Sequence, residues 1–301
     1  MDVSVIIVSF NSAHWAKRCV QSIQHWTHGL QYEVIVVDNA SPDGSGSALK
    51  AALPGATVIQ RRRNGGFSVA ANDGAHLARG RLLLFLNPDT TLEGDLLGLL
   101  SAYLLDHPDA GAIGPRLLDS DGGLQLSCRR FPSHRTALFN RYSLLTRLLP
   151  GNRQSRDYLL SGWRHDQIRD VDWLSGACLM LPRRVFEQVG GFDEGLFFSA
   201  EDVDLCLRLN CVGYRVVYNP AVSVTHTIGA SSRTVPNRII IARHLGMWRY
   251  YRKHLRGGRL LDGVTLIGIG ARFLLQLVLT NAGRFSPLRR FQVSQSEDSR
   301  P

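Results

Sequence analysis

Short apolar runs alternate with longer amphipathic stretches over the first hundred residues of the chain. Helix-length stretches, in which apolar residues recur every three or four positions, cover residues 13–26, about 45–52, 67–79 and 93–106. The runs between them have the length and composition of buried strands: "VSVIIVSF", "YEVIVVD", "ATVIQ" and "RLLLFLN". Strands that alternate with helices in this way form a mostly parallel sheet with helices on its faces. The pattern therefore predicts an α/β fold.

The pattern becomes more varied after these first strands and helices. Residues 110–130 predict an antiparallel pair around the turn "DSDGG", whereas residues 131–170 are Arg-rich and lack a core face, which indicates a mobile insertion or an acceptor loop. A strand returns in "DVDWLSGACLML", and it is followed by a helix that begins at Pro182 and ends before Gly190. A second helix runs to about Asn210, and two strand-like runs follow, "YRVVYN" and "AVSVTH".

Beyond Arg243 the chain is helical in pattern and basic. We therefore divide it into a main domain, residues 1–242, and a C-terminal helical extension, residues 243–301, with a disordered end. Charged residues interrupt the apolar stretch 260–280, which on a helix has an apolar face and a polar stripe. The apolar face is Leu266, Ile269, Phe273 and Leu277, and the polar stripe is Thr265, Gly268, Arg272 and Gln276. A helix in a membrane interface and a helix packed on the protein's own body fit this pattern equally well.

The whole net charge of +10 lies in the C-terminal part of the chain. Residues 1–228 contain 22 Lys and Arg against 22 Asp and Glu, whereas residues 229–301 contain 13 against 3. Such an excess predicts an anionic partner, either a membrane surface or a nucleic acid. No basic motif interleaved with aromatic residues accompanies it, so we expect a membrane surface and no nucleic acid.

The cysteines and the first apolar run bear on the compartment. The five cysteines are scattered, odd in number and without a CxxC pair, which argues against a disulfide framework and a zinc site. The first apolar run has eight residues, which is too short for a signal peptide or a membrane span. We therefore expect a protein that is made and kept inside the cell.

Polar residues follow the predicted strands, at the positions where parallel sheets bind their ligands. They are Asn11, Asp38, Asn64 and Asp89. Asp38 suits a hydrogen bond from a nucleobase or a ribose, and suits equally well the capping of the turn "NASPDGS". Arg63, Asn64 and two glycines open a helix whose N–H groups and positive charge suit an anion such as a diphosphate. These residues together favour a nucleotide ligand.

Two common nucleotide-binding motifs are missing from the sequence, and their absence excludes two classes of nucleotide-binding protein. No GxGxxG follows the first strand, which excludes a dinucleotide-dependent dehydrogenase, and no GxxxxGK[ST] is present, which excludes a P-loop NTPase.

Asp89, in "LLLFLNPDT", suits Mg²⁺ or Mn²⁺ held by carboxylate and phosphate oxygens. The same letters also signal a turn, but the position of Asp89 at the end of a buried strand favours the metal.

An acidic segment, "FDEGLFFSAEDVDLC" (residues 192–206), places five carboxylates among aromatic residues. It contains no Lys or Arg to pair with them, unlike a surface helix. One interpretation is a capping box, in which Ser199 is the N-cap and Asp202 stands three residues later. The other is catalytic chemistry, with Phe192, Phe197 and Phe198 as an apolar wall that excludes water.

These motifs together resemble the family 2 glycosyltransferases of the GT-A fold, in particular their bacterial rhamnosyltransferase-like branch. The resemblance implies a GT-A domain with a mostly parallel central sheet and flanking helices, extended here by C-terminal helices. The matching segments run in order from residue 3 to about residue 231: "VSVIIVSFNS", "EVIVVDNASPDGS", "RNGGFSVAANDG", "LLFLNPDT", "SGACLMLPRRVFEQVGGFDEGLFFSAEDVDL" and "GYRVVYNPAVSVTHTIGAS".

The resemblance also implies roles for individual residues. In the family, the residue at Asp38 contacts the nucleoside, and Asp89 ends a DxD motif that meets a Mg²⁺ or Mn²⁺ ion. Asp202 corresponds to the catalytic base, and His226 to a residue that helps to hold the diphosphate and the metal. Asn87 replaces the first acid of DxD, which puts strict metal dependence in doubt. The expected donor site comprises Ser9, Asn11, Asp38, Arg63, Asn64 and Asn87.

On the acceptor side we expect contacts from Glu201, Trp173 and Phe198. A carboxylate such as Glu201 can bind sugar hydroxyls, and aromatic rings can stack on a sugar face. For Trp173, a place in the hydrophobic core is the alternative interpretation.

The activity implied by the resemblance is an inverting sugar transfer. Asp202 takes the proton of an acceptor hydroxyl while that hydroxyl attacks the anomeric carbon opposite the leaving diphosphate. We expect L-rhamnose to move from dTDP-rhamnose to a lipid-linked or polysaccharide acceptor of the cell envelope, at the cytoplasmic face of a bacterial inner membrane. UDP-galactofuranose, UDP-glucose and a non-catalytic nucleotide-sugar-binding protein are the alternatives. The joint presence of Asp38, Asp89, Asp202 and His226 argues against the last of these.

Overall fold

The computed structural model describes residues 1–134, 153–227 and 236–282. The strands in these residues are β1 (Val3–Ser9), β2 (Tyr32–Asp38), β3 (Thr57–Gln60), β4 (Leu82–Leu86), β5 (Thr90–Leu92), β6 (Ala110–Leu118), β7 (Leu124–Gln125), β8 (Cys128–Arg129), β9 (Arg169–Val171), β10 (Trp173–Leu174), β11 (Cys178–Pro182) and β12 (Arg215–His226). The helices are α1 (Ala13–Trp26), α2 (Ser45–Ala52), α3 (Phe67–Leu77), α4 (Leu96–Asp106), α7 (Arg153–Leu159), α8 (Arg183–Gln188), α9 (Glu201–Cys211), α10 (Pro236–His254) and α11 (Arg259–Asn281).

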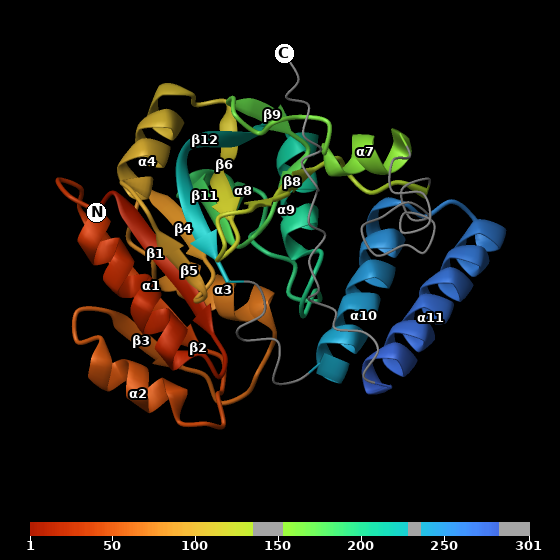
Figure 1. Cartoon of the computed structure of the whole chain (residues 1–301), viewed down its shortest axis with the longest axis horizontal. Helices are drawn as coiled ribbons and strands as arrows, with labels where there is room; N and C mark the ends of the chain where they lie inside the picture. Colours follow the sequence, from red (N-terminus) through yellow and green to blue (C-terminus); the bar gives the residue numbers. More distant parts are fainter. Residues whose placement is uncertain (135–152, 228–235, 283–301) are drawn as a thin grey trace, which may run out of the picture.

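The central sheet has the strand order β3-β2-β1-β4-β11-β6-β12-β5 (Figure 1). β1, β2, β3 and β4 are parallel to one another, and β12 is parallel to β6. β11 runs antiparallel to β4 and β6, and β7 pairs antiparallel with β6 around the predicted turn. The predicted α/β fold with a mainly parallel sheet is therefore confirmed.

Helices cover both faces of this sheet, because successive residues of a buried strand point to opposite sides. In β1, Val5 and Ile7 pack in one core with residues of α1, α2 and α4, whereas Ile6 packs in a second core with residues of α3, α8 and α9. Because both faces of the sheet are covered, every residue of β4 (Leu82–Leu86) is buried, which agrees with its continuous apolar sequence.

Three predicted elements differ from the observed ones in extent. The run "DVDWLSGACLML" forms β9, β10 and β11 instead of one strand, because these pair with β12, β8 and β4 respectively. The runs on either side of Pro220 form one strand, β12, whose pairing with β6 is irregular between Asn219 and Ser223, where proline offers no N–H. The helix expected from residue 93 begins at Leu96, because the Asp95 side chain accepts a hydrogen bond from the Gly98 N–H at 2.9 Å.

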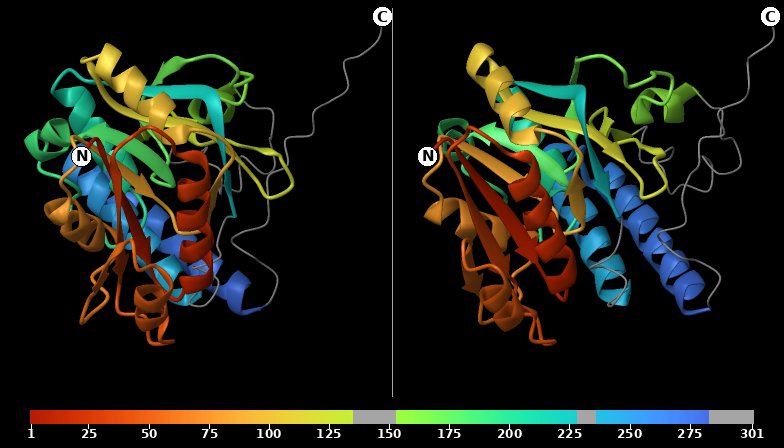
Figure 2. Two further views of the ribbon diagram at one scale, coloured as in Figure 1. Left: turned by 90° about the vertical axis from the view of Figure 1, so that its left-hand side faces the viewer. Right: turned by 60° about the vertical axis from the view of Figure 1, so that its left-hand side comes forward.

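The C-terminal helices α10 and α11 form an antiparallel hairpin beside the α/β body (Figures 1 and 2). The Tyr251 hydroxyl donates to the Asp262 carboxylate at 2.8 Å, and the rings of His244 and Phe273 lie 5.5 Å apart. The division expected between residues 242 and 243 falls inside α10, which begins at Pro236. Residues 135–152 of the expected insertion and the expected disordered end, 283–301, lie outside the described residues.

Helix α11 carries its apolar residues on the outside of the hairpin. Leu260 and Ile267 are 85% and 73% exposed, whereas Gln276 is buried against the hairpin and Asp262 bonds to α10. The polar stripe is therefore observed in part. The exposed apolar face differs from the expected one, because Phe273 packs against α10 instead of facing outward. The exposed apolar residues of α11 are Leu260, Val264, Leu266, Ile267, Leu274, Leu275 and Val278.

Candidate active site

The parallel pairing of the first strands brings the predicted site residues to one edge of the sheet. Ser9, the last residue of β1, is in register with Asp38 at the end of β2. Asp38 is in turn in register with Gln60 at the end of β3. β4 ends next to them, and the antiparallel β11 begins there, so that the Asn87 N–H donates to the Ala177 carbonyl at 2.9 Å.

Asp38 lines a cavity of about 310 Å³ at this edge. Its buried carboxylate accepts hydrogen bonds from the N–H and the hydroxyl of Ser41, so the turn-capping interpretation holds. The cavity also leaves room for a ligand, because Gly46 has no side chain. A Cβ atom at this position would lie 2.8 Å from the Asp38 carboxylate and would fill part of the space. The lining residues are Asp38, Ala40, Ser41, Gly44, Gly46, Ser47, Gln60 and Arg61.

Asn39, which the sequence analysis missed, joins the end of β2 to the Arg-Asn-Gly-Gly loop. Its amide nitrogen donates to Asn64 Oδ1 and to the Gly66 carbonyl, each at 3.0 Å. Its amide oxygen accepts from Arg61 at 2.9 Å and from the Gly65 N–H at 3.2 Å. The only signal in the sequence was its position next to Asp38. Arg63, on the same loop, has an exposed side chain.

Asn11 and Ser9, at the turn between β1 and α1, differ in whether their side chains already have a hydrogen-bond partner. Asn11 adopts a positive φ of 50°, and its N–H donates to the Ser41 hydroxyl at 2.9 Å. Its side-chain oxygen is buried and has no hydrogen-bond partner within the described part of the chain, so it is available to a ligand. Ser9 is fully buried, and its hydroxyl shares a hydrogen bond with Ser12, which corrects the expectation that Ser9 faces the donor.

Asp89 and His226 meet on the far side of the same edge. His226, the last residue of β12, is in register with Thr90 of β5, directly after Asp89 in the chain. The His226 Nε2 atom lies 3.4 Å from Asp89 Oδ1, and Asn87 Nδ2 lies 3.3 Å from the same nitrogen. Both the Asp89 and the His226 side chains are largely buried.

Gln125 determines which nitrogen of His226 carries the proton. Its amide nitrogen donates to Asp119 at 2.8 Å and to the His226 carbonyl at 2.6 Å, so its oxygen must face His226 Nδ1, 3.0 Å away. Nδ1 then donates, and in the neutral imidazole Nε2 presents a lone pair toward Asp89. A histidine that donates one ring N–H to an amide and offers the other nitrogen suits a metal ion. No pattern in the sequence pointed to Gln125.

Asp202 lies near the start of α9 and is turned back toward the sheet edge. Its carboxylate accepts from the Gly176 N–H at 3.1 Å, and Gly176 immediately precedes the residue that bonds Asn87. The capping-box interpretation is wrong, because α9 is capped at Ala200 with no side-chain hydrogen bond. Ser199 and Ala200 instead have φ values of 72° and 77°, a left-handed conformation that is costly for residues with a side chain.

Glu201 and Asp202 form a partly buried acidic pair at this point. Burial, together with the adjacent charge of Asp202, raises the pKa of Glu201 to about 8. Burial also raises the pKa of Asp202, although the N–H groups of Gly176 and Val203 and the charge of Arg129 oppose the shift. One oxygen of Glu201 is buried and without a hydrogen-bond partner in the described residues. Raised pKa values in a carboxylate pair are typical of sites that move protons.

The aromatic residues expected near the acceptor are only partly where the sequence placed them. Trp173 is 6% exposed, and its indole N–H donates to the Arg130 carbonyl at 2.8 Å, so it belongs to the core and is no acceptor platform. Phe192 is 2% exposed and packs edge-on against Phe67 and Phe85, which removes it from the expected apolar wall. Phe198 is half-buried, in the acidic segment just before Asp202.

Comparison with known proteins agrees with this arrangement. The sequence model described as Glycosyl transferase family 2 matches residues 4–168 of the chain. The N-acetylglucosaminyl-diphospho-decaprenol L-rhamnosyltransferase of Mycobacterium tuberculosis is 31% identical over 267 residues, which are 81% of this chain and 86% of that protein. The O-antigen biosynthesis protein RfbC of Myxococcus xanthus is 31% identical over 241 residues, 77% of this chain but 18% of that larger protein.

A solved structure shares the fold at lower sequence identity. The mannosyltransferase PcManGT from Pyrobaculum calidifontis, in complex with GDP-Man and Mn²⁺, has a TM-score of 0.56 and 18% identity, over 95% of this chain and 81% of that one. The sheet, the site and these relatives define an enzyme class: the protein is a glycosyltransferase of the GT-A fold. Within that class it belongs to glycosyltransferase family 2, in the rhamnosyltransferase-like branch.

The raised pKa of Asp202 predicts how sugar transfer depends on pH. If the ionised carboxylate accepts a proton, kcat at saturating substrate should fall as the pH is lowered through this pKa, which lies above that of an exposed aspartate. Glu201→Gln should keep this acid limb, because burial is its main cause, and should remove any change in rate near pH 8. An acid limb at the ordinary aspartate pKa, or its loss in Glu201→Gln, would contradict the assignment.

Proposed function

We propose that the protein is an inverting glycosyltransferase that moves L-rhamnose from a nucleoside-diphosphate sugar to a lipid-linked acceptor in cell-envelope glycan synthesis. The observation that carries the proposal is the convergence of Asp38, Asp89 and Asp202 on one sheet edge, where Ala177 bonds to Asn87 and the adjacent Gly176 bonds to the Asp202 carboxylate. The choice of sugar and acceptor is supported by the name of the M. tuberculosis relative, whose length the chain matches over 86%.

The nucleoside of the donor binds in the cavity beside Asp38. A buried carboxylate there accepts a base N–H or a ribose hydroxyl, and the free side-chain oxygen of Asn11 offers a second acceptor on the same side. The loop that Asn39 and Asn64 hold together leads from this cavity toward the diphosphate, with N–H groups of Gly65 and Gly66 turned to those two side chains.

Asp202 is the base of the transfer. It takes the proton from the acceptor hydroxyl, the hydroxyl oxygen forms a bond to the anomeric carbon, and the bond from that carbon to the diphosphate oxygen breaks. The electron pair leaves with the nucleoside diphosphate, and the product has the inverted configuration. The N–H groups of Gly176 and Val203 each hold one oxygen of the carboxylate, and its remaining lone pairs serve the acceptor.

The residues at Asp89 fit a divalent metal ion. A buried carboxylate and His226 Nε2 face one another at 3.4 Å, and in the neutral ring with its proton on Nδ1, toward Gln125, Nε2 has a free lone pair. No group of three or more acidic, His or Cys side chains that could hold a metal occurs in the described residues, so the diphosphate would complete the coordination. A bound Mg²⁺ or Mn²⁺ would stabilise the charge on the leaving diphosphate.

The hairpin of α10 and α11 places the enzyme on the membrane that holds its acceptor. By length and composition, α11 is the helix in the described residues that could cross a bilayer, with a mean hydropathy of 1.7. Its most exposed residues are apolar, whereas the polar Gln276 is buried, and the surrounding sequence carries 13 basic residues against 3 acidic ones. Apolar insertion and attraction to anionic lipid reinforce each other, which favours peripheral binding at the cytoplasmic face.

The assignment of the base can be tested with Asp202→Asn. The amide oxygen can still accept from the Gly176 N–H, so we expect normal folding and normal donor binding by calorimetry. Transfer should fall by about 10² or more, because the amide cannot take a proton. The assay incubates each protein with dTDP-rhamnose, UDP-galactofuranose or UDP-glucose and a polyprenyl-diphosphate-sugar acceptor. Transfer by Asp202→Asn at the wild-type rate would disprove the role of Asp202, and a preference for another donor would disprove that of rhamnose.

The metal site predicts a graded series of variants. Excess EDTA should abolish transfer, and Mn²⁺ or Mg²⁺ should restore it. Gln125→Leu should weaken Mn²⁺ binding about tenfold or more, since the tautomer of His226 is then no longer fixed. Asn87→Asp, which adds a second acid, should strengthen binding. Mn²⁺ affinity is measured by calorimetry in the presence of nucleoside diphosphate, and full activity in EDTA would exclude the site.

The orientation of the hairpin predicts how the protein binds vesicles. It should float with anionic vesicles at low salt and be partly released at high salt, because charge and apolar insertion both contribute. Leu260→Ser together with Ile267→Ser should abolish flotation, whereas the exposed Leu105→Ser on α4 serves as a control. Resistance to both high salt and alkaline carbonate would indicate a spanning helix, and an absence of binding would indicate a helix packed on the protein alone.

A further inference from the structure

The acidic segment (residues 192–206) is held on one side by α3. The Phe67 N–H donates to the Phe197 carbonyl at 2.8 Å, and the Ser68 hydroxyl donates to the Leu196 carbonyl at 2.6 Å. Gly66 is required for this approach, because a side chain there would lie 2.4 Å from the Phe197 carbonyl oxygen. These contacts end before the strained residues Ser199 and Ala200, so α3 does not fix the turn that carries Asp202.

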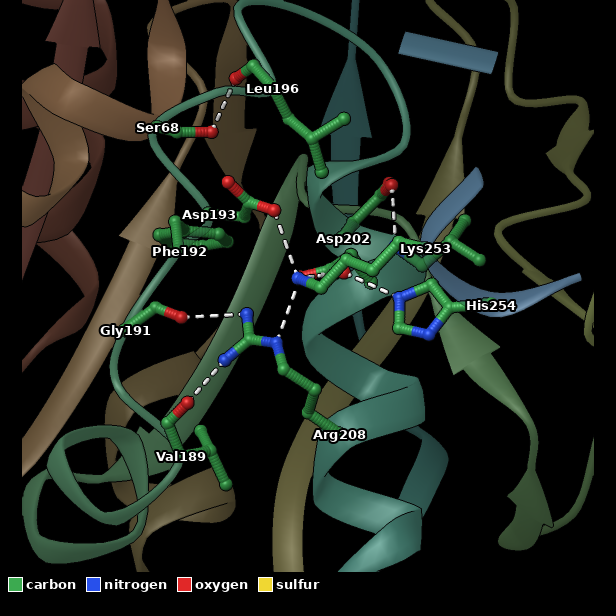
Figure 3. A network of polar contacts seen from close by, with 12 residues as sticks. Ser68, Val189, Gly191, Phe192, Asp193, Leu196, Asp202, Arg208, Lys253 and His254 are labelled. Atoms are coloured by element: carbon green, nitrogen blue, oxygen red, sulfur yellow. Dashed lines mark hydrogen bonds and ion pairs between the residues drawn. The ribbon is translucent and has the colours of Figure 1, made fainter. Parts of the chain in front are cut away.

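Helix α10 contacts the acidic segment on the other side, through charge. Lys253 Nζ lies 2.9 Å from the Asp193 carboxylate and 2.7 Å from that of Asp204, so a single ammonium group bridges both acids. His254 Nε2 lies 2.7 Å from Asp204, on the same side as Lys253 (Figure 3). Arg249 lies 2.7 Å from Asp193. The two acids flank Asp202 in the chain, and without the bridge their negative charges would repel each other.

Asp204 is fully buried and depends on these partners. Arg208, one turn further along α9, contacts its other oxygen at 2.8 Å and also donates to the Gly191 carbonyl at 2.7 Å (Figure 3). Burial alone would raise the pKa of Asp204, but the hydrogen bonds from Lys253 and His254 and the charge of Arg208 hold it below its usual value. The carboxylate is therefore kept ionised two residues from Asp202.

Helix α10 also touches the strained turn itself. Gly246 faces the backbone of Phe198 and Ser199, and a side chain at this position would lie 2.6 Å from the Ser199 carbonyl oxygen. Gly246, Arg249 and Lys253 recur every three or four residues, so they lie along one face of the helix. This face follows the acidic segment from the strained turn to the start of α9.

We propose that α10 acts as a brace that positions the catalytic base, with Lys253 as the positioning residue that closes the acidic segment around Asp202. The inference rests on the proposed role of Asp202. It makes the hairpin part of the catalytic apparatus as well as the membrane-facing element, because α10 touches both the acidic segment that carries the base and the helix that carries the apolar surface.

The test compares Lys253→Met with Arg252→Met and Lys253→Arg. Arg252 is exposed on the same helix, and its guanidinium lies over the Trp248 ring, so its loss removes an equal charge without touching the acidic segment. With acceptor in uncharged detergent, Lys253→Met should lower kcat about tenfold or more, because small displacements of a catalytic group are costly. Its KM and dissociation constant for the donor should not change, since the donor cavity lies at Asp38. Arg252→Met should match the wild type, and Lys253→Arg should recover most of kcat.

A second readout is independent of activity. Release of the brace should expose the bonds after Phe197 and Phe198 to chymotrypsin, so Lys253→Met should be cut there faster than Arg252→Met, as identified by fragment mass. Gly246→Ala should have the same two effects without changing any charge. Gly263→Ala, where an added side chain meets nothing within 4 Å, is its matched control.

The outcomes separate this inference from the proposed function. Equal protection and equal kcat in Lys253→Met and Arg252→Met would overturn the brace, even if Asp202→Asn is inactive. Faster cleavage and lower kcat in Lys253→Met alone would support the brace. If Asp202→Asn transferred sugar normally while Lys253→Met was cut faster, the brace would stand and the choice of base would be wrong.

Discussion

The site depends above all on the parallel pairing of β1, β2 and β4. Parallel strands end at the same edge, so Asp38 and Asp89, which are far apart in the sequence, reach one side of the sheet without any long loop. The antiparallel β11 then enters at that edge, and Gly176, just before its first residue, brings the N–H that holds Asp202. The donor residues and the base therefore come from different parts of the chain, yet the hydrogen bonds of a single sheet fix their relative positions.

Within the acidic segment, two carboxylates are paired with cations and two are not, and the two groups have different roles. Asp193 and Asp204 each have cationic partners within 3 Å, and the pKa of each lies below its ordinary value despite burial. Among the described residues, no ion pair joins a cation to Glu201 or Asp202, and burial raises their pKa values. Acids that hold the structure are thus kept charged, while those at the reacting centre are left able to gain and lose a proton.

Much of this arrangement could be predicted from the sequence, because the strands are strongly apolar and their polar ends are regular. The α/β sheet and the edge positions of Asp38 and Asp89 follow from local pattern alone. The partners of Asp202 and His226 do not, since Gly176 and Gln125 are recruited by strand pairing between distant segments. Trp173 was misplaced for the same reason: its burial depends on a two-stranded pairing of β10 with β8 that no local pattern announces.

The bridge made by Lys253 has a consequence for the order in which the protein is assembled. A chain is made from its N-terminus, so the strands, the donor cavity and α9 are synthesised before α10. Until α10 has been synthesised, Asp193 and Asp204 lack the ammonium group that they share, and the backbone at Ser199 lacks its contact with Gly246. A nascent chain would accordingly acquire its nucleotide-binding half first and its working base last. Competence for transfer would then coincide with the appearance of the helices that face the lipid.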